Sequence, residues 1–514
     1  MIYLVALFLG LWYWRRNHGD ELIWQLATYL GVGGLLWFNY NAAAASGGVF
    51  SEALPRIVRD FLLLGMVGFV QSLAVNKRMP IWLAVVITLG IFALAHFLEF
   101  QPPGADRSAD PGNRTQWLDP AAEQAMTEAT LSATGEWLVQ VDHGDQRLAA
   151  AARRLGWRIE PAFAPRAEDI TELDDYYVVD VTDQQRSAAL LRDFGFVRYF
   201  EPNEVVTVRL PETNRGPVPA PPALSINDPD AGQQWAMQQL DMNAYYAVLN
   251  GVKPQKTARI AILDTGVDAA HEDIAANYFT IDKRYDNDGM GHGTHCAGIA
   301  AGVTNNGIGI GSLAGGMDRF VDVTSVKVLG AGGMGTQKSI IAGIIEAADE
   351  GVDVISLSLG AISNGSRLKA YNQAVKYARD QGAIVVAAAG NSNRDARGYS
   401  PANSSGIIAV AAVDQGLKRA VFSNTVNNVK WGIAAPGVAI YSTTPGDTYK
   451  AYSGTSMACP FVAGLLATLR AIDPDLTAQQ AYRVLHDTGT PGPDVATTGR
   501  IVNPAAAVRA VLDR

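Results

Sequence analysis

The first hundred residues carry four apolar runs, the first of them short, separated by more polar segments. The last run is close to the ~20 apolar residues that a helix needs to cross a bilayer. Trp, Tyr and Phe near the ends of the runs are typical of the membrane–water interface and disfavour helices buried in a soluble protein. The pattern predicts an all-α transmembrane region over residues 1–100, with about four helices: Met1–Trp14, Leu22–Phe38, Phe61–Val75 and Ile81–Phe100.

Positive charge in the short loops predicts the orientation of these spans. Arg15 and Arg16 separate the first two runs, Lys77 and Arg78 separate the last two, and such loops stay in the cytoplasm. The lipid bilayer is therefore a predicted partner, and residues after 100 are expected on the extracytoplasmic side of a cytoplasmic (inner) membrane, in a multi-pass protein. A signal peptide is the alternative for the first run, but that run lacks a basic start and a small-residue cleavage site.

The hydrophobic pattern changes after residue 100. Residues 101–134 are polar and begin Gln-Pro-Pro-Gly, which is typical of a flexible linker. Residues 135–210 follow the order strand, helix, strand, strand, helix, strand, which predicts a small ferredoxin-like α+β domain, with a generic linker domain as the alternative. The expected strands are Glu136–Asp142, Trp157–Ala164, Tyr176–Val181 and Val197–Arg209, and the expected helices are Asp145–Leu155 and Asp183–Phe194.

A proline-rich linker, 211–227, precedes a larger domain, 228–514. Apolar strand-like runs alternate there with helical segments, which predicts an α/β fold with a doubly wound, mainly parallel sheet. Functional residues are expected at the carboxyl ends of its strands. The expected strands are Arg259–Leu263, Val323–Val328, Val352–Leu357, Ala383–Ala389 and Ile407–Val413, and the expected helices include Gly293–Ala301, Gln337–Asp349 and Lys369–Gln381.

Composition excludes some functions. The formal net charge is -9 and no Lys/Arg-rich run occurs, so nucleic acid is not an expected partner. The two cysteines, Cys296 and Cys459, lack the spacing of a zinc site. They are predicted to be buried thiols, with a disulfide as the alternative.

Four short motifs carry candidate chemistry. Asp264 ends an apolar strand-like run, His292 lies in Gly-His-Gly-Thr-His, Asn391 follows the run 383–389, and Ser456 lies in Gly-Thr-Ser-Met-Ala before an apolar helix. A serine nucleophile needs a histidine base, an acid that orients the base, and donors for the oxyanion. Alone, each motif has an ordinary structural explanation, since Gly-Thr-Ser is a common helix cap and Gly-Asn a common turn.

Together, from about 228 to 512, the four motifs resemble the subtilisin-like serine proteases (subtilases, peptidase family S8). The resemblance implies that Ser456 is the nucleophile, His292 the base and Asp264 its orienting acid, while Asn391 donates to the oxyanion. His295 and His271 are then structural hydrogen-bonding groups. The implied peptide-binding residues are the two edge segments Gly333, Met334, Gly335 and Ser358, Leu359, Gly360, with Ala388, Ala389 and Gly390 as a pocket wall.

The resemblance also implies a structural Ca²⁺ ion, for which a simple Asn-Gly turn is the alternative. Hard oxygen ligands of this number suit calcium rather than zinc. The implied ligands are Asp228, Asp273, Thr304, Asn306, Ile308 and Ile310. Two positions depart from the family pattern. Phe461 stands where many subtilases carry histidine, and Pro211 follows the end of the small domain, which places proline near the expected maturation site.

The small domain before the larger one resembles the inhibitory propeptide of that family, which lays its C-terminal tail through the substrate cleft. The predicted function is therefore a membrane-anchored serine endopeptidase, made as an inhibited zymogen, that hydrolyses protein or peptide substrates through an acyl-enzyme. Two alternatives stay open: a membrane receptor or scaffold whose protease-like domain only binds peptides, and a transpeptidase or macrocyclase that uses the same acyl-enzyme.

Overall fold

The computed structural model describes residues 135–167, 169–181, 183–208, 224–315, 319–363 and 368–514. The predicted membrane spans and the linker 101–134 lie outside these residues, as does most of the linker 211–227. Within the described ranges, α13 (Thr455–Ile472) alone has the length and hydropathy of a membrane-spanning helix, and all of it is buried inside the protein. The apolar character of α13 therefore reflects a core position.

Residues 135–208, here called the N-terminal domain, form a four-stranded antiparallel sheet with strand order β2-β3-β1-β4. Successive side chains of a strand point to opposite faces of the sheet, so alternate residues pack into two different hydrophobic cores. Val139 and Val179 pack with Leu148 and Leu191 of the two helices, whereas Leu138 joins the core of the larger domain. The elements are β1 (Glu136–Val141), α6 (Arg147–Leu155), β2 (Arg158–Pro161), β3 (Tyr176–Asp180), α7 (Gln184–Asp193) and β4 (Val197–Pro202).

The larger domain is built on a six-stranded sheet of order β14-β13-β11-β9-β6-β7, in which every neighbouring pair is parallel. The predicted parallel α/β architecture is confirmed. The strands are nearly all buried on both faces, since helices cover both sides. Their bounds are β6 (Ala258–Asp264), β7 (Val321–Lys327), β9 (Val354–Leu357), β11 (Ile384–Ala388), β13 (Ile407–Val413) and β14 (Gly432–Pro436).

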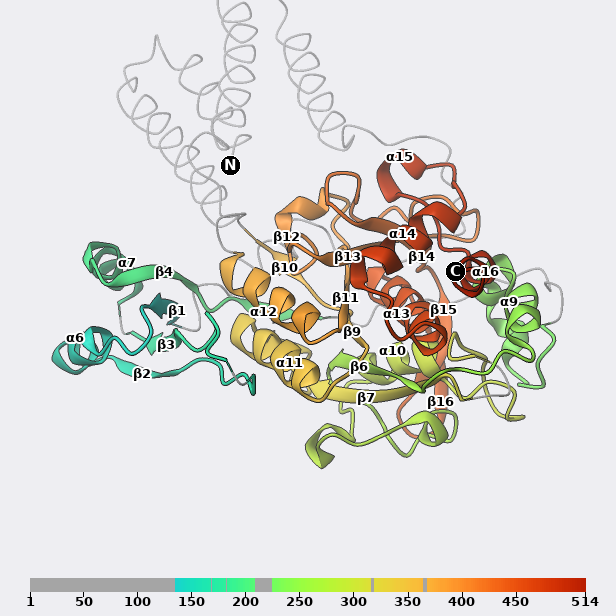
Figure 1. Ribbon diagram of the computed structural model, residues 1–514, viewed down its shortest axis with the longest axis horizontal. Coiled ribbons are helices and arrows are strands. Elements are labelled where there is room, and N and C mark those ends of the chain that lie inside the picture. The colour runs from blue at the N-terminus through green and yellow to red at the C-terminus, as the bar shows by residue number, and fades with distance from the viewer. Residues whose placement is uncertain (1–134, 168, 182, 209–223, 316–318, 364–367) are drawn as a thin grey trace, which may run out of the picture. The chain divides into compact units, whose positions relative to one another are not determined.

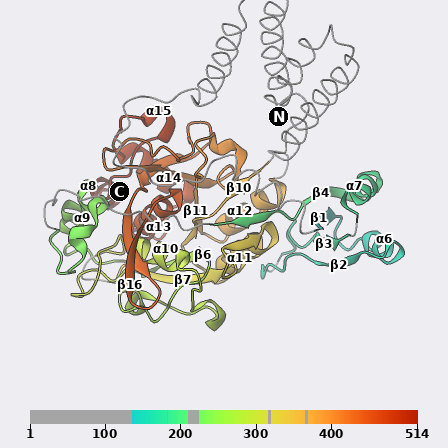
Figure 2. The same ribbon diagram turned by 180° about the vertical axis from the view of Figure 1, so that it is seen from behind.

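Helices α10 (His292–Ala301) and α13 pack together on one face of this sheet, and α11 (Gln337–Asp349) and α12 (Lys369–Asp380) pack together on the other. Figures 1 and 2 show α11 and α12 between the sheet and the N-terminal domain. The remaining elements surround this core: α8 (Trp235–Gln239), α9 (Met242–Leu249), α14 (Ala478–Thr488), α15 (Val495–Thr498), α16 (Pro504–Leu512), and the short strand pairs described next.

Three short antiparallel pairs lie outside the two larger sheets. β15 (Ile440–Thr444) pairs with β16 (Thr448–Tyr452), and β10 (Ala361–Ile362) pairs with β12 (Tyr399–Ser400). The third joins the two domains, because β5 (Val205–Thr207) pairs with β8 (Met334–Thr336). The end of the N-terminal domain therefore lies along the edge segment 333–335.

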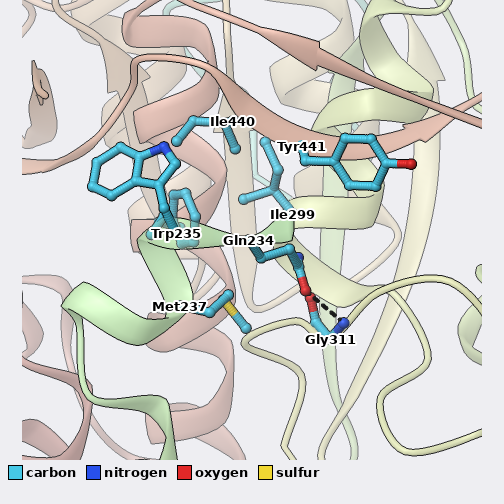
Figure 3. A pocket seen from close by; sticks show the side chains of 9 residues that line it. Gln234, Trp235, Met237, Ile299, Gly311, Ile440 and Tyr441 are labelled. Carbon is cyan, nitrogen blue, oxygen red and sulfur yellow. Dashed lines mark hydrogen bonds between the residues drawn. The ribbon is translucent and has the colours of Figure 1, made fainter. Parts of the chain in front are cut away.

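Phe461, which departs from the family pattern, is buried on α13 and lines a small cavity. Figure 3 shows other residues that line this cavity. They include Trp235, Ile299 and Ile440, and the nearby Gln234 side chain both donates to and accepts from the Gly311 backbone. The phenylalanine therefore fills apolar packing space.

Candidate active site

The carboxylate of Asp264 and the imidazole of His292 form a buried pair at the end of β6. Nδ1 of His292 lies 2.8 and 2.9 Å from the two carboxylate oxygens, and Thr265 N donates to the same carboxylate. His292 is the first residue of α10, and a Cβ on the next residue, Gly293, would lie 2.0 Å from Gly266 O. Glycine at 293 therefore lets the helix start press against the strand end that carries Asp264.

Two opposing effects act on the pKa of His292. Burial, the largest effect, lowers it, but the charge and hydrogen bond of Asp264 and the charge of Asp288 outweigh burial and leave the pKa raised. Because Asp264 holds Nδ1 as the protonated nitrogen, Nε2 becomes the acceptor of neutral His292. Nε2 is buried and makes no hydrogen bond in the structure. The pair is thus arranged as a base with a free lone pair.

His295 and His271 are hydrogen-bonding groups, as predicted. Burial lowers the pKa of His295 to about 3, so the ring is neutral, and its Nε2 lies 3.0 Å from the carbonyl oxygen of Lys450. Nδ1 of His271 accepts from Asp273 N, which leaves its Nε2 to donate to Thr448 O. Both cysteines are buried free thiols, which confirms that prediction as well.

Ser456 lies in the first turn of α13, and its Oγ donates to the carbonyl oxygen of Ser358 at 3.0 Å. Pro460, four residues later, has no N–H to bond the Ser456 carbonyl. That carbonyl instead accepts from the Ser358 hydroxyl at 2.9 Å and from the Cys296 thiol at 3.5 Å. The proline therefore leaves a backbone carbonyl free to bond α10 and the segment just after β9, which fixes the start of α13.

The amide of Asn391 is fixed by the residue before Ser456. Its Oδ1 accepts from both N and Oγ1 of Thr455, at 2.8 and 2.9 Å, so its NH₂ group is left as a donor. A Cβ added to Gly454 would lie 3.4 Å from Asn391 Nδ2 and 3.6 Å from Ser456 N. Both nitrogens therefore flank one face of Gly454 as a pair of donors.

Two of the three predicted peptide-binding segments, 358–360 and 388–390, adjoin these groups. Gly333, Met334 and Gly335 face β5, and Ser358 touches Ser456 directly. Ala388, Ala389 and Gly390 lead into Asn391 and are buried or half-buried. Leu359 is buried, and a Cβ on Gly360 would lie 3.0 Å from Ser400 O.

The predicted calcium ligands gather around two buried carboxylates. Asp228 accepts backbone N–H groups from Asn305 and Asn306 at 2.7 and 2.9 Å, and Asp273 accepts from Ile310 N at 2.8 Å. Burial, the largest cause, raises the pKa of both carboxyls, that of Asp273 to about 7, and the charge of Asp228 adds to the effect on Asp273. Such a pair favours a bound cation.

One predicted ligand atom is engaged differently. Asn306 donates its NH₂ group to Asp273 at 2.9 Å, and its Oδ1 accepts from Ile308 N at 2.8 Å. Thr304 uses its hydroxyl to accept from Ser312 N. Coordination by the Asn306 oxygen therefore requires its amide to turn. The four oxygens of the two carboxylates already accept N–H groups, so a cation would share these oxygens with the N–H donors.

Comparison with known proteins agrees with this geometry. The Subtilase family model matches residues 255–502. Thermitase from Thermoactinomyces vulgaris is 44% identical over 249 residues, which are 47% of this chain and 84% of that protein. The chain belongs to the subtilase family. Like the subtilases it matches, it is a serine endopeptidase.

Other similar proteins are M-protease from Shouchella clausii and a solved structure. M-protease is 32% identical over 346 residues, which are 65% of this chain and 85% of that protein. The structure, titled proteases from Pseudoalteromonas arctica PAMC 21717, is 30% identical, with a TM-score of 0.48, and covers 56% of this chain and 99% of its own.

Three contacts in this subtilase are not expected from the sequence. The Ser456 hydroxyl donates to the Ser358 carbonyl, and Thr455 donates two hydrogen bonds to Asn391 Oδ1. The Asp288 carboxylate accepts backbone amides at the start of the helix that carries His292. Pro460 inside the predicted helix signals only a related bond, from the Ser358 hydroxyl to the Ser456 carbonyl, since it leaves that carbonyl without a helical partner. Asp288 stands four residues before His292, but nothing in the sequence shows which way its side chain points.

Proposed function

We propose that Ser456, His292 and Asp264 are the nucleophile, base and orienting acid of this serine endopeptidase. The observation that carries the proposal is the two-oxygen contact of Asp264 with His292 Nδ1, which leaves Nε2 as an acceptor without a hydrogen bond. The Ser456 hydroxyl donates to the Ser358 carbonyl in the structure, so it turns to Nε2 before the proton is transferred. Attack on the scissile carbonyl forms an acyl-enzyme, and His292 delivers the proton to the leaving amine. Loss of casein hydrolysis in Ser456→Ala tests this assignment.

Substrate binds as an extended strand between 333–335 and 358–360 in this proposal. Support comes from β5, an extended piece of the same chain, which pairs antiparallel with β8 and continues with Val208 N donating to Gly333 O at 2.8 Å. β5 also contacts β10, directly after the second edge segment. Pairing through the backbone recognises little sequence, so the apolar wall 388–390 supplies the preference for an apolar side chain.

The N-terminal domain is proposed to be the inhibitor of the same chain, so the enzyme is made as a zymogen. Its order β2-β3-β1-β4, with two helices on one face, supports a ferredoxin-like fold. The match to M-protease exceeds the length of 228–514, so part of it lies before the larger domain. A strand that occupies the edge intended for substrate blocks the cleft.

The domain interface also completes a helix. The first backbone amides of α11 have no partner within the helix. Gln337 N donates to Glu204 O at 2.7 Å, and Lys338 N donates to Asn203 Oδ1 at 2.9 Å. The Gln337 side chain donates to Glu201 Oε1 at 3.0 Å. The inhibitor therefore caps α11, which gives this contact a fixed register.

A pH-dependent release of β5 is expected from Glu201. Burial, the largest cause, raises its pKa to about 7 from 4.5 in this interface. Glu201 holds its proton more tightly when the two domains are associated than when they are apart. Its protonation therefore stabilises the association fully below the unshifted pKa of 4.5, and this contribution is lost as pH rises through about 7. Protection of the Val206 and Val208 amides from hydrogen exchange, measured in full-length Ser456→Ala, should fall by up to roughly 100-fold between pH 5 and pH 8 beyond the intrinsic change.

Glu201→Gln should remove this dependence, whereas Glu160→Gln, at an exposed carboxylate that pairs with Lys338 across the interface, should keep it. Equal pH dependence in Glu201→Gln and the parent would rule Glu201 out as its source.

A calcium ion is proposed at Asp228 and Asp273, with the carbonyl oxygens of Thr304, Ile308 and Ile310 and the side chain of Asn306 as further ligands. A ligand bound by the native state alone stabilises it by mass action. Excess chelator should lower the Tm by roughly 5–10 °C, and Asp273→Asn should show a lowered Tm that chelator does not change further. An unchanged parent Tm, once elemental analysis shows that no calcium remains, would refute the site.

Residues 1–100 are proposed to anchor the enzyme in the cytoplasmic membrane, with the two domains outside. The support is the charge pattern of the loops. Alkaline phosphatase fused after Phe100 should be active in cells, and the same enzyme fused after Arg78 should be inactive. The reverse pattern of activities would overturn this topology.

A further inference from the structure

Asp288 lies in the loop before α10, half-buried, and its carboxylate accepts five hydrogen bonds. Oδ1 accepts from Thr265 Oγ1 at 2.8 Å, Met290 N at 3.0 Å and Gly291 N at 2.8 Å. Oδ2 accepts from Thr294 N at 2.9 Å and from Thr294 Oγ1 at 2.8 Å. One side chain therefore accepts from three backbone amides at the start of this helix and just before it.

These donors belong to two different elements. Thr265 directly follows Asp264 at the end of β6, and its hydroxyl also accepts from Gly293 N at 3.1 Å. The other three residues flank or begin α10, which has Gly291 at its N-cap and so no side-chain cap. Asp288 therefore bridges the end of the strand that carries Asp264 and the helix start that carries His292. A charged acceptor is stabilising at a helix N-terminus.

We infer that Asp288 is a positioning residue for His292, which fixes the imidazole against Asp264 and adds a second negative charge beside it. This inference rests on the proposed triad. The role differs from that of Asp264, because the imidazole hydrogen-bonds to Asp264 and not to Asp288. Asp288 acts through the backbone of residues 290–294 and through Thr265.

The charged groups around His292 are few within the described ranges. The two carboxylates come from β6 and from the loop before α10. Burial raises the pKa of the Cys296 thiol well above its usual range and that of Cys459 to about 12, and it lowers that of His295, so all three are neutral near pH 7. Removal of the Asp288 charge should therefore make the imidazole easier to deprotonate, and not harder.

The test compares Asp288→Asn with the parent enzyme by kinetics over pH. The expected kcat is roughly ten- to 100-fold lower with KM little changed, since small misplacements of a catalytic group cost this much. The acidic limb of kcat/KM should move to lower pH. Asp288→Glu should return the acidic limb of kcat/KM to the pH of the parent enzyme, because glutamate keeps the charge. Its kcat should stay low, because the longer side chain alters the geometry.

Asp286→Asn is the matched control. This carboxylate lies two residues earlier and accepts from Tyr278 and Thr280, so neither kcat nor the limb should change. If Asp288→Asn does not fold, Thr265→Val is the second variant, since it removes the hydrogen bond from Thr265 to Asp288. It should lower kcat without shifting the acidic limb of kcat/KM. Parent-like kcat and limb in folded Asp288→Asn, or an unchanged kcat in Thr265→Val, would overturn the inference.

An NMR titration of His292 in the Ser456→Ala background separates this inference from the triad proposal. The measured pKa of His292 should fall in Asp288→Asn whether or not the enzyme turns over. An unchanged pKa would refute the electrostatic part of the role of Asp288. Full activity of Ser456→Ala would instead refute the triad. The His292 titration would still show whether Asp288 raises the pKa of His292.

Discussion

Ser456→Ala and His292→Ala should each reduce kcat for casein hydrolysis by roughly 10⁴- to 10⁶-fold, and the double variant should be no worse than either. The reason is that a nucleophile without its base, or a base without its nucleophile, cannot begin the reaction. Asp264→Asn should be almost as damaging, because the imidazole then loses the partner that fixes its tautomer. Initial rates on parent and variant enzymes, each separated from its N-terminal domain, measure these losses.

His486→Ala is the control for this series. His486 is exposed on α14 and pairs with the neighbouring Asp487, so its loss should leave kcat unchanged. The Tm of each variant shows whether lost activity follows lost folding. Turnover within tenfold of the parent in any of the three triad variants would show that the triad is assigned wrongly.

Asn391→Ala should lower kcat by about 10²- to 10³-fold and leave KM close to the parent value. The NH₂ group of Asn391 and the N–H of Ser456 flank one face of Gly454, where the oxyanion of the tetrahedral intermediate is expected. The substrate carbonyl places no full negative charge there before attack. The hydrogen bond therefore strengthens in the transition state, which is why its loss appears in kcat.

Asn391→Asp tests the donor role of the Asn391 NH₂ group separately from the structural role of its side-chain oxygen. Aspartate keeps an oxygen that accepts from Thr455, so the loop should stay in place and the Tm should change little. Its charge would oppose the oxyanion, so kcat should fall at least as far as in Asn391→Ala. Parent-like kcat in Asn391→Asp would exclude Asn391 from oxyanion binding.

The catalytic sheet was predictable because its strands are buried on both faces. Helix Gln337–Asp349 and strand Ile407–Val413 match the prediction to the residue, and β6 is one residue longer at each end. Continuous apolar runs and clear helical periods specify such elements locally. Asp264 was also expected at a strand end, where the structure places it 2.8 Å from His292.

Contacts that depend on orientation were not predictable. The sequence contains Ser358 and Ser456 but does not show that the Ser456 hydroxyl donates to the Ser358 carbonyl. The resemblance predicts that the side-chain oxygen of Asn306 binds a metal. In the structure that oxygen accepts from Ile308 N, and the NH₂ group donates to Asp273. Each outcome follows from competition among neighbouring donors, which exists only after the chain has folded.

The register of β5 against β8 shows the same limit. An extended tail over 197–209 was expected, and the structure divides it into β4 and β5, with Val206 opposite Gly335. The hydrophobic pattern gives the extended conformation, but the partner of each residue depends on how the N-terminal domain caps α11.

Covalent labelling with a fluorophosphonate, followed by peptide mapping, tests most directly whether Ser456 is the activated nucleophile. On mature enzyme, freed of the N-terminal domain, the label should be found on Ser456, and His292→Ala should slow the labelling by orders of magnitude. Hydrolysis that proceeds while Ser456 remains unlabelled, or a label on a different serine that abolishes activity, would contradict the account.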